Sequence, residues 1–576
     1  MINVKENEEL NVLNHSCAHL MAQAVKHLYP NAKFWVGPVV EEGFYYDIDL
    51  GDQVINDNDI DKIEKEMKKI AKDGKRIIRQ EISREEALEK FKDDLYKIDL
   101  INNMPEGEII SCYTQGDFTD LCRGPHVESV KELKNFKLLK HSGAYWKGDA
   151  NNKMLQRIYG ICFPSAEELE QHLIQIEEAK KRDHRKLGKE MGLFMMSDYG
   201  PGLPFWLPNG FTLRRTLEDF WLKLHADRGY TTIDTPIFLN RELWETSGHW
   251  DHYKDDMYTF DVEDGTYAIK PMNCPGAILV YNNALHSYKE LPLRYSELGH
   301  VHRYEASGAL SGLFRVRGFT QDDAHILLME SQIGDEVARI LDLYDYVYSI
   351  FGLNYSIELS TRPESFIGEV AVWDEAEHAL EKACVATGHS FKINPGDGAF
   401  YGPKLDFKLT DSLGRIWQCG TVQLDMQLPG RFNCTYIAED GSKKTPVMIH
   451  RACFGSLERF IGILIENYGG VFPLWLAPRQ ISIIPVNSEI HGDYANKVMK
   501  QLHEAGFKVE VDNRNEKLGY RMREAQIAKI PVVLVVGDNE MNTNSVNVRR
   551  HGKEGQDSKT INDLIVELSN EVKDKK

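Results

Sequence analysis

The stretch that most constrains the fold is Arg294–His325, in which arginines, acids and histidines alternate within two strand-like runs. One run ends at His302, a Ser-Gly-Ala turn follows at 307–309, and a second run returns to Gly318. Runs of this kind on either side of a short turn predict a long antiparallel hairpin. We expect arginines on both arms, where rigid guanidinium groups bind polyphosphates bidentately and stay protonated.

A solvated charged hairpin is the alternative interpretation, since charged side chains generally prefer water. The neighbouring motifs decide against it. Lys270–Gly276 precedes the hairpin, and Gly398–Lys404 and the strand-like Gln418–Gln423 follow it. The region closes with Gly455–Phe460, a Gly-Ser turn that opens an apolar helix and places Arg459 in its first turn. Such a helix start directs N–H donors and positive charge toward a phosphate.

The chain is long and acidic, with 576 residues and a net charge of −19. The length favours three or four domains. The negative charge argues against indiscriminate binding of nucleic acid, but it permits a local RNA site. Nine scattered cysteines without a CxxC pair indicate the reduced thiols of a cytoplasmic protein. The sequence has no charged-then-apolar leader and no apolar run of bilayer length, so we expect no membrane association.

Two histidine-containing motifs mark the N-terminal part of the chain. His15 and His19 are four residues apart in a helical pattern, so they share one face of the helix. Cys122 and His126 form a second pair, and Gly37–Asp47 reads as a strand-turn-strand that could wall a pocket beside them. Three histidines and a cysteine could hold tetrahedral zinc. They could also line a hydrolytic pocket, or be satisfied side chains of the core.

The remaining segments give the domain organisation. Residues 59–93 are charged and helical in pattern, which is typical of a solvated face. Residues 166–192 predict one long charged helix that bridges domains, with a boundary near Arg182. Residues 478–576 alternate strands with helices, which predicts an α/β domain with a mostly parallel sheet; its expected strands are 481–485, 508–512 and 532–536.

In this order, the motifs resemble those of the threonyl-tRNA synthetases, a family of class II aminoacyl-tRNA synthetases. A helix at 214–229 and a strand at 230–235 that ends at Pro236 resemble motif 1. HVHRYE with FRVRGFTQDD resembles motif 2, and GSLERFIG resembles motif 3. HSCAH with CRGPH resembles the editing domain of bacterial-type members, and the resemblance runs from about Leu13 to about Lys573.

The resemblance implies a multidomain α+β protein. It implies an editing domain with a terminal linker helix at 1–182, and a class II catalytic domain built on an antiparallel sheet at 183–477. It also implies a C-terminal α/β anticodon-binding domain at 478–576. Typical bacterial members begin with a further ubiquitin-like domain, and we expect this chain to lack it. Family members of this class act as homodimers, so a second copy is the expected protein partner.

The implied activity is ATP-dependent ligation of L-threonine to tRNA(Thr) through threonyl-adenylate, with Mg²⁺ accompanying ATP. Adenylate formation needs positioning and charge stabilisation more than acid–base chemistry. The resemblance assigns Arg303 to the α-phosphate and Arg459 to the γ-phosphate as catalytic groups. It assigns ATP contacts to Arg303, Glu305, Arg315, Gln418, Thr421 and Arg459, and threonine contacts to Met272, Gln321, Asp323, Tyr401, Lys404 and Gln423.

Threonine and valine have nearly the same shape, and a hydrophobic pocket separates such isosteres poorly. The family solves this problem with zinc, which it binds through one cysteine and two histidines. The matching residues are Cys274, His325 and His450. That set fits a zinc site with open positions, although the spacing of the three residues would not have revealed it.

Serine also carries a β-hydroxyl, and the loss of one methyl group is discriminated only about 10–200-fold. A second site must therefore hydrolyse seryl-tRNA. The resemblance assigns this editing to His15, His19, Tyr46, Lys97, Asp120, Cys122 and His126, acting through positioned water rather than a metal. It assigns anticodon contacts to Asn515, Glu540 and Arg549; solvated loop residues are the alternative for these three.

Two other functions compete with threonine ligation. A non-catalytic paralogue that binds tRNA or mRNA would be expected to lack Arg303, Arg459 or a zinc ligand, and all are present. A class II synthetase for proline, serine or histidine is disfavoured by the HSCAH and CRGPH motifs and by the Cys-His-His set.

Overall fold

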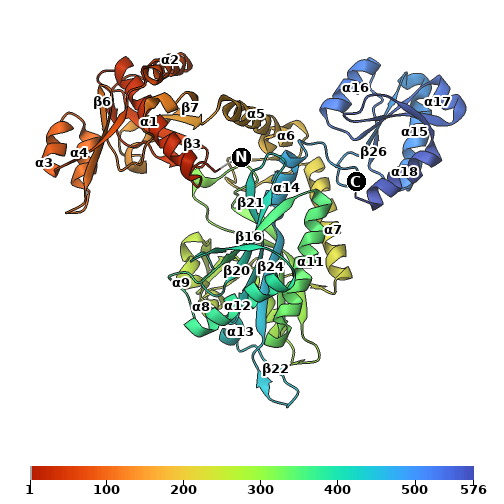
Figure 1. The fold of residues 1–576 in the computed structure, drawn as a ribbon. Coiled ribbons are helices and arrows are strands. Elements are labelled where there is room, and N and C mark those ends of the chain that lie inside the picture. Colours follow the sequence, from red (N-terminus) through yellow and green to blue (C-terminus); the bar gives the residue numbers. More distant parts are fainter. Residues whose placement is uncertain (1–2, 576) are drawn as a thin grey trace. The chain divides into compact units, whose positions relative to one another are not determined.

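The computed structural model describes residues 3–575, which form two compact units, Met1–Glu178 and Ala179–Lys576 (Figure 1). Among the described residues, no helix is both long enough and apolar enough to cross a bilayer. Helix and strand are mixed throughout, as the predicted multidomain α+β class requires, and that prediction is confirmed.

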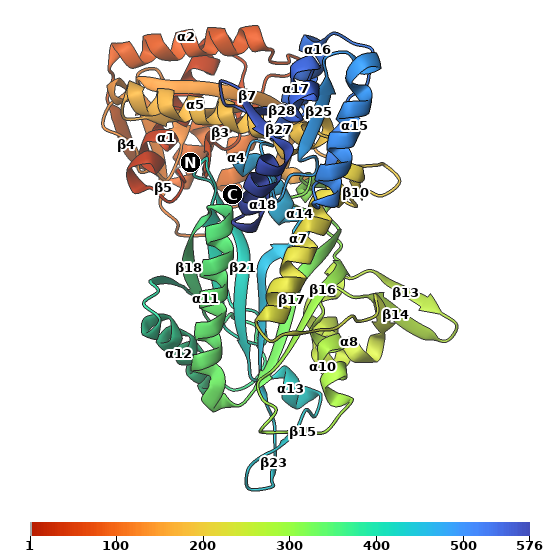
Figure 2. The same ribbon diagram turned by 90° about the vertical axis from the view of Figure 1, so that its right-hand side faces the viewer.

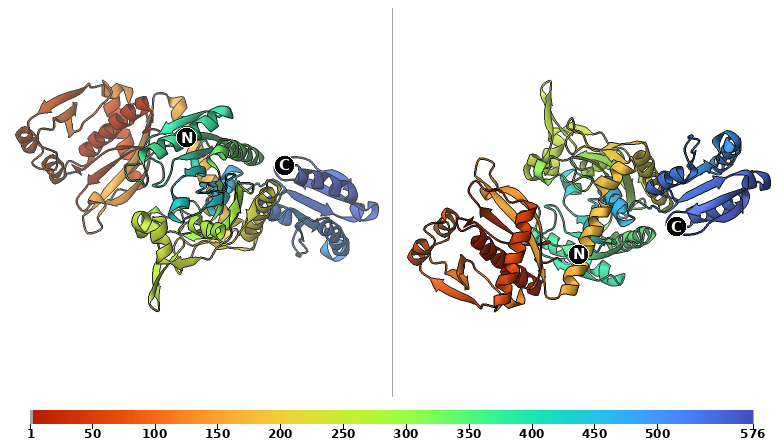
Figure 3. Two further views of the ribbon diagram at one scale, coloured as in Figure 1. Left: turned by 90° about the horizontal axis from the view of Figure 1, so that it is seen from below. Right: turned by 90° about the horizontal axis from the view of Figure 1, so that it is seen from above.

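The first unit is built on an antiparallel sheet covered by helix α1 (Glu8–Leu28) (Figure 3). Asn7 caps the helix by accepting the N–H of Leu10, and Glu8 and Glu9 stabilise its first turn through the helix dipole. Its apolar face enters the core of the unit. The strands lie in the order β1-β3-β8-β7 with β2 beside β3: β1 (Lys33–Phe34), β2 (Val39–Val40), β3 (Gly43–Asp49), β7 (Asn135–Tyr145) and β8 (Met154–Phe163).

The first unit also contains a smaller three-stranded sheet, and here one prediction is wrong. Residues 59–93 are not helical throughout, because β4 (Ile77–Ile82) interrupts them. It pairs on one side only, and its polar residues Arg79, Gln80 and Glu81 are exposed, so they continue the charged pattern of the flanking helices. The other elements are α2 (Asp57–Asp73), α3 (Arg84–Lys90), α4 (Leu95–Asn102), β5 (Ile110–Gln115) and β6 (Phe118–Leu121).

The predicted single helix over 166–192 is also wrong in detail. Helix α5 (Ala166–Arg182) ends at Arg182, and α6 (His184–Glu190) starts anew. Asp183 separates them with extended ψ, and its carboxylate accepts the N–H of Arg185 as an N-cap. No proline or glycine marks this break, so the helical periodicity concealed it.

The second unit centres on an eight-stranded sheet, and helices α7 (Pro208–Asp227) and α11 (Ile333–Phe351) lie along one of its faces (Figure 2). Only the outermost pairs, β11–β16 and β18–β19, are parallel. The strand order is β11 (Thr231–Thr232), β16 (Leu293–His302), β17 (Gly318–Leu328), β24 (Val447–Ser456), β21 (Ile416–Asp425), β20 (Lys404–Thr410), β18 (Asn354–Ser360) and β19 (Phe391–Asn394). The antiparallel catalytic sheet was predicted.

Strands β16 and β17 form the predicted hairpin, paired from Leu293↔Leu327 to His302↔Gly318. The arginines assigned to phosphate are not on its arms, however, and Arg294 on β16 is paired with Glu336 instead. Residues 303–317 form a loop between the strands, with a single turn of 3-10 helix at Ser307–Ala309. The expectation of guanidinium groups on rigid strands is corrected, since Arg303 and Arg315 belong to this loop.

The remaining helices and strands of this region are mostly short. Helix α14 (Leu457–Asn467) continues directly from β24, as the Gly-Ser turn predicted, and the Ser456 hydroxyl accepts the N–H of Arg459. The other elements are β9 (Phe194–Met195), β10 (Phe205–Trp206), β12 (Phe238–Asn240), α8 (Arg241–Ser247), α9 (His249–Tyr253), β13 (Thr259–Val262), β14 (Gly265–Ile269), α10 (Cys274–Asn282), β15 (His286–Ser287), α12 (Val370–Ala386), α13 (Leu428–Arg431), β22 (Tyr436–Ile437) and β23 (Lys443–Lys444).

The C-terminal part of this unit is an α/β layer with helices on both sides of its sheet (Figure 3). Strands β26, β25 and β27 are parallel, while β28 and β29 add antiparallel pairs. The predicted pattern is confirmed, with β25 (Ile481–Pro485), α15 (Ser488–Glu504), β26 (Val509–Val511), α16 (Leu518–Ile527), β27 (Val532–Val536), α17 (Asp538–Thr543), β28 (Ser545–Arg550), β29 (Asp557–Thr560) and α18 (Ile561–Lys573).

Candidate active sites

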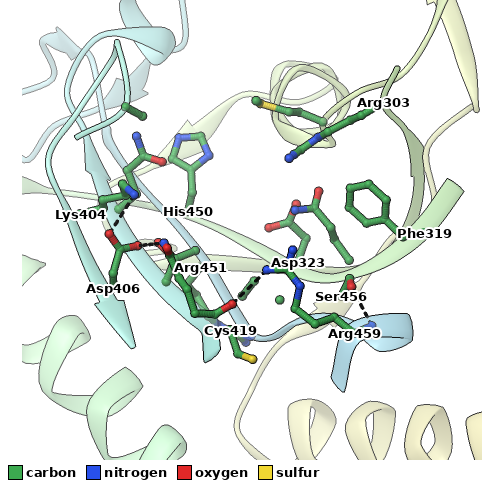
Figure 4. A pocket seen from close by; sticks show the side chains of 18 of the residues that line it. Arg303, Phe319, Asp323, Lys404, Asp406, Cys419, His450, Arg451, Ser456 and Arg459 are labelled. Carbon is green, nitrogen blue, oxygen red and sulfur yellow. Dashed lines mark hydrogen bonds and ion pairs between the residues drawn. The ribbon is translucent and has the colours of Figure 1, made fainter. Parts of the chain in front are cut away.

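A cavity of about 470 Å³ opens over the middle of the eight-stranded sheet. Figure 4 shows Lys404 and Asp406 across it from Arg303 and Phe319. Every residue that the sequence assigned to ATP, threonine or metal lines this cavity except the buried His325: Met272, Cys274, Arg303, Glu305, Arg315, Gln321, Asp323, Tyr401, Lys404, Gln418, Thr421, Gln423, His450 and Arg459. The structure thus brings together residues from segments far apart in the chain.

Three arginines converge on one part of the cavity. Arg303 lies over the ring of Phe319 at 5.2 Å, and its Nε donates to the carbonyl of Pro271. Arg459 is held by two carbonyls, those of Phe314 at 3.0 Å and Gln418 at 3.1 Å. Burial lowers the pKa of Arg459, and the nearby Arg315 and Arg303 lower it further. Positive charge is therefore concentrated here, which suits a polyanion.

Cys274, His325 and His450 form a compact buried group whose ligand atoms all lie within 4.8 Å of one another. The sheet places the two histidines side by side, because His325 on β17 pairs directly with His450 on β24. Both ring nitrogens of His325 are buried without a hydrogen-bond partner, as is Nδ1 of His450. Buried polar atoms are normally satisfied, so these unpaired nitrogens fit the donors of a metal site.

The side chains around this group are held by further hydrogen bonds. Asp323 is buried, and burial raises its pKa to about 6. The Nδ2 of Asn273 donates to its carboxylate at 3.0 Å. Gln423, the strand partner of His450, donates to the carbonyl of Gly402. A carboxylate fixed beside candidate metal ligands can accept a hydrogen bond from a small polar substrate.

Three buried aspartates, which sequence reasoning missed, fix the cavity from behind. Asp425 contacts Nε2 of His450 at 2.9 Å, which leaves Nδ1 toward the cluster. Asp406 binds Lys404 at 2.8 Å and accepts from Gln418 at 2.7 Å. Asp322, on the opposite face of β17, accepts three consecutive backbone N–H groups at the start of the turn into α14: Cys453, Phe454 and Gly455. An acid amid apolar strand residues is the signal that could have found them.

The first unit carries a second polar cluster, which contains all seven residues predicted to line the editing pocket. His15 and His19 lie on α1, Tyr46 on β3, Lys97 on α4 and Asp120 on β6, with Cys122 and His126 in the following loop. Cys122 Sγ lies 3.2 Å from Nε2 of both His15 and His126. Asp120 binds Lys97 at 2.6 Å and also accepts from the hydroxyl of Tyr46.

Burial keeps the histidines and the cysteine of this cluster uncharged. It lowers the pKa of His19 to about 4 and lowers the pKa values of His15 and His126, so the imidazoles are uncharged at neutral pH. It raises the pKa of Cys122 to about 11, so the sulfur is a thiol and a poor nucleophile. Burial would also raise the pKa of Asp120, but Lys97 and His19 hold it below its usual value.

The three predicted anticodon residues are not gathered at one place. Asn515 is exposed in the loop after β26, and Glu540 lies on α17 after β27, so both follow the carboxyl ends of parallel strands. Glu540 accepts the N–H of Gly537 and so caps its own helix. Arg549 pairs with Val533, toward the amino end of β27, and donates to Gln556.

Comparisons with known proteins agree with this arrangement. Residues 258–468 match the tRNA synthetase class II core domain (G, H, P, S and T). Residues 480–571 match the anticodon binding domain. Residues 110–159, which include Asp120, Cys122 and His126, match the threonyl and alanyl tRNA synthetase second additional domain.

Full-length relatives extend the match over the whole chain. The threonine–tRNA ligase of Desulforamulus reducens is 54% identical over 577 residues, covering 100% of this chain and 91% of that protein. That of Clostridioides difficile is 54% identical over 99% of this chain and 89% of that protein. The crystal structure of the RNA binding domain of threonyl-tRNA synthetase from Cryptosporidium parvum is 41% identical, with a TM-score of 0.66 over 67% of this chain and 98% of that one. This chain belongs to the threonine–tRNA ligase family of class II aminoacyl-tRNA synthetases.

Proposed function

We propose that this chain joins L-threonine to tRNA(Thr) in the cavity of residues 183–477 and hydrolyses seryl-tRNA(Thr) in the pocket of residues 1–182. The observation that carries this proposal is the pairing, in one cavity, of a three-arginine cluster with a Cys-His-His group whose buried nitrogens lack partners. The arginine cluster fits the phosphates of ATP, and the Cys-His-His group fits a metal that binds the amino acid.

In the first step, a carboxylate oxygen of threonine attacks the α-phosphorus of ATP. The P–O bond to the β-phosphate breaks, and pyrophosphate leaves with its charge balanced by Mg²⁺. We assign the α-phosphate to Arg303 and the γ-phosphate to Arg459, with Arg315 beside them; their clustering in the cavity supports this. Preorganised guanidinium groups stabilise the charge that develops as the bond breaks. In the second step, a ribose hydroxyl of tRNA attacks the acyl carbon and AMP leaves.

The adenosine end of ATP is assigned to the side of the cavity beside the loop 303–317. Glu305 is proposed to accept the adenine amino group. Gln418 and Thr421 on β21 are proposed to contact the nucleotide as well. The hydrogen bond from Gln418 to the buried Asp406 supports this, because it holds the amide in one orientation. A fixed amide reaches a bound ligand at a low entropy cost.

The Cys274, His325 and His450 group is proposed to hold one zinc ion. Its donor types are those zinc prefers, and the carboxylate of Asp425 behind His450 is the usual support of a metal-bound imidazole. When bound, zinc supplies open positions for the amino and hydroxyl groups of threonine. Asp323 accepts the same hydroxyl, held in place by Asn273. Valine lacks the hydroxyl and leaves these groups unpaired, which is why it is rejected.

Met272, Gln321, Tyr401, Lys404 and Gln423 are proposed to complete the threonine pocket. The ring of Tyr401 lies 5.2 Å from that of His450, which supports a wall beside the side chain of the substrate. Lys404 is held at 2.8 Å by Asp406, so its ammonium group is fixed at the edge of the cavity. There it can attract the threonine carboxylate.

Seryl-tRNA is proposed to be hydrolysed by positioned water, and no metal is assigned to this step. Water attacks the ester carbonyl, the ribose oxygen of the tRNA leaves and takes up a proton, and free serine is released. Cys122 is an unsuitable nucleophile because its thiol stays protonated. The neutral imidazole of His19 can accept and return the proton of the water, beside His15 and His126, whose rings contact Cys122. Lys97, Asp120 and Tyr46 form a fixed network beside them.

Recognition of tRNA is proposed to involve residues 478–576, through Asn515, Glu540 and Arg549. Splayed anticodon bases are read by stacking and by hydrogen bonds to their edges. The exposure of Asn515 supports a base contact at that position. The match of residues 480–571 to the anticodon binding domain supports the assignment of the region.

A second copy of the chain is proposed as the protein partner. Strands β12, β13 and β14 expose an aromatic patch in which Phe238 is 55% and Phe260 37% accessible, with their rings 5.7 Å apart. Burying such a patch in a homodimer would stabilise the pair. A reducing cytoplasmic setting is proposed as well, because all nine cysteines are free.

Threonine-dependent exchange of pyrophosphate into ATP tests the proposed activity directly. Exchange should require threonine, and valine should support far less of it. Exchange that depends on proline or serine instead of threonine would overturn the proposal. For the homodimer, the double variant Phe238→Asp/Phe260→Asp should sediment as one copy of the chain, whereas the wild type should sediment as two.

A further inference from the structure

His184, the first residue of α6, has no part in the chemistry described so far. Its ring is buried, with 1% of the residue exposed. Nε2 accepts the backbone N–H of Leu313 at 2.9 Å, and Nδ1 lies 2.6 Å from Oε1 of Glu466. A backbone N–H can only donate, so Nε2 must carry the lone pair and Nδ1 the proton. The geometry therefore fixes the tautomer of this histidine.

Asp183, His184 and Glu466 also lie close enough together to suggest a cation site. Both nitrogens of His184 are already engaged, so the ring has no lone pair left for a metal. Glu466 is engaged as well, since its other oxygen lies 2.5 Å from Arg415 and its first also accepts the N–H of His184. The hydrogen bonds that join Leu313, His184 and Glu466 instead connect two parts of the fold, and we call this connection the strut.

One end of this strut is the loop 303–317. Leu313 is fully buried, and the ring of the next residue, Phe314, packs on His184 with centroids 4.1 Å apart. The carbonyl of Phe314 in turn accepts from Nε of Arg459 at 3.0 Å. Arg315, the following residue, lines the cavity. Fixing the backbone at Leu313 thus fixes two of the three arginines in the cluster.

The other end of the strut is helix α14. Glu466 lies on the same helix as Arg459, near its C-terminal end. Glu466, His184, Leu313, Phe314 and Arg459 therefore close a circuit that begins and ends on one helix. The loop packs tightly against the ring of His184, because a Cβ at Gly312 would lie 2.1 Å from Nε2 of His184.

We propose that His184 is a positioning residue for ATP: through the N–H of Leu313 it holds the loop so that Phe314 orients Arg459 and Arg315 faces the cavity. This inference rests on the proposed role of those arginines in binding ATP. The proposed role also depends on the break between α5 and α6, because this break places His184 at the first position of a helix.

Two substitutions separate the two hydrogen bonds of the ring. In His184→Gln, the amide oxygen can reach the place of Nε2 and accept from Leu313. In His184→Asn, the shorter amide can occupy the place of Nδ1 and donate to Glu466, but the N–H of Leu313 is left buried and unpaired. Leaving a buried donor unpaired is costly. We expect His184→Asn to raise the KM for ATP about tenfold in threonine-dependent exchange.

The same variant should change the KM for threonine and the deacylation of seryl-tRNA less than about twofold, since neither depends on this loop. His184→Gln should stay within about threefold of the wild type in all three. Equal losses in both variants, or a rise in the KM for threonine that matches the rise for ATP, would show a merely structural role and overturn the proposal.

Gly312→Ala provides an independent test in which His184 is unchanged. The added methyl group would clash with the ring and would strain the left-handed backbone at Gly312, so the loop should shift and the KM for ATP should rise selectively here too. A folded Gly312→Ala protein with an unchanged KM for ATP would overturn the proposal, even if His184→Asn did not fold. A wild-type protein without threonine-dependent exchange would instead contradict the proposed function. Failure of the proposed function can therefore be distinguished from failure of the proposal for His184.

Discussion

The two cysteine–histidine groups of this chain use the same residue types in opposite states. Both have ligand atoms within 4.8 Å of one another. In the cavity over the eight-stranded sheet, proposed to form threonyl-adenylate and called the synthetic cavity below, both ring nitrogens of His325 are buried and unpaired. In the editing pocket, the sulfur of Cys122 is already hydrogen-bonded to His15 and His126.

The surroundings explain the difference. His450 contacts Asp425 through Nε2 and has an unpaired Nδ1, an arrangement that fits a metal-bound imidazole with a supporting carboxylate. His126 instead contacts the hydroxyl of Ser16 on one nitrogen and Cys122 on the other. A group whose donors and acceptors satisfy one another has less need of a metal. Unpaired atoms thus separate a candidate metal centre from a polar pocket better than residue identity does.

The largest expected effect is on the synthetic group. Cys274→Ser keeps the size of the side chain but replaces a thiolate ligand with a weak one. Threonine-dependent exchange should fall about a thousandfold. Deacylation of seryl-tRNA should be unchanged, because the editing residues lie in another unit. Cys434→Ser, at a buried cysteine outside the metal group, is the matched control and should retain exchange. Retained exchange in Cys274→Ser would remove the distinction between the two groups.

The arginine cluster should respond somewhat less. Arg459→Ala removes one preorganised donor, and exchange should fall about 10²–10³-fold. Arg459→Lys should recover only part of this loss, since an ammonium cannot reproduce the two-carbonyl geometry. Arg479→Ala, in the C-terminal region, removes an arginine paired with Glu510 and serves as the control. An exchange rate unchanged in Arg459→Ala would contradict the phosphate assignment.

The editing pocket should show the reverse selectivity. Cys122→Ala removes a side chain in contact with two histidines, and deacylation of seryl-tRNA should fall about 100-fold. Threonine charging should persist, while seryl-tRNA accumulates. Cys112→Ala, at a buried cysteine on β5, tests for general damage to the unit. Equal rates of deacylation in Cys122→Ala and the wild type would count against the assignment.

The smallest effect concerns stability against pH. The folded pKa of His19, about 4, lies below its unfolded value, so the unfolded state takes up the proton first. Stability from this residue is present above pH 6.5 and is lost as the pH falls toward 4, by about 3 kcal/mol. Asp120, whose folded pKa is lowered, remains ionised through this window. Hydrogen exchange of α1 should show the loss, and His19→Asn should reduce it without abolishing it, since burial lowers the pKa values of His15 and His126 as well. A profile unaffected by His19→Asn would exclude this cause.

The sequence predicted those parts of the molecule that leave a local pattern. The hairpin followed from its strand-like runs and turn, and the C-terminal α/β layer followed from its alternating elements. Residues of the synthetic site were found through the family motifs. The strand β4 was missed because its exposed residues Arg79, Gln80 and Glu81 continue the charged pattern of the helices on either side.

Contacts between distant residues could not be predicted from the sequence. Cys274, His325 and His450 meet because β17 and β24 pair in one register, and no spacing encodes that register. His184 and Leu313 are separated by 129 positions and joined by a single hydrogen bond to a backbone N–H, which any residue can supply. The buried aspartates behind the cavity act on backbone and side-chain partners that only the fold brings near.

The zinc content of the purified chain tests the contrast between the two groups most directly. Elemental analysis should find one zinc per chain in the wild type and in Cys122→Ala, and almost none in Cys274→Ser. Zinc that is lost in Cys122→Ala but kept in Cys274→Ser would reverse the assignment, and a wild-type chain without zinc would contradict it.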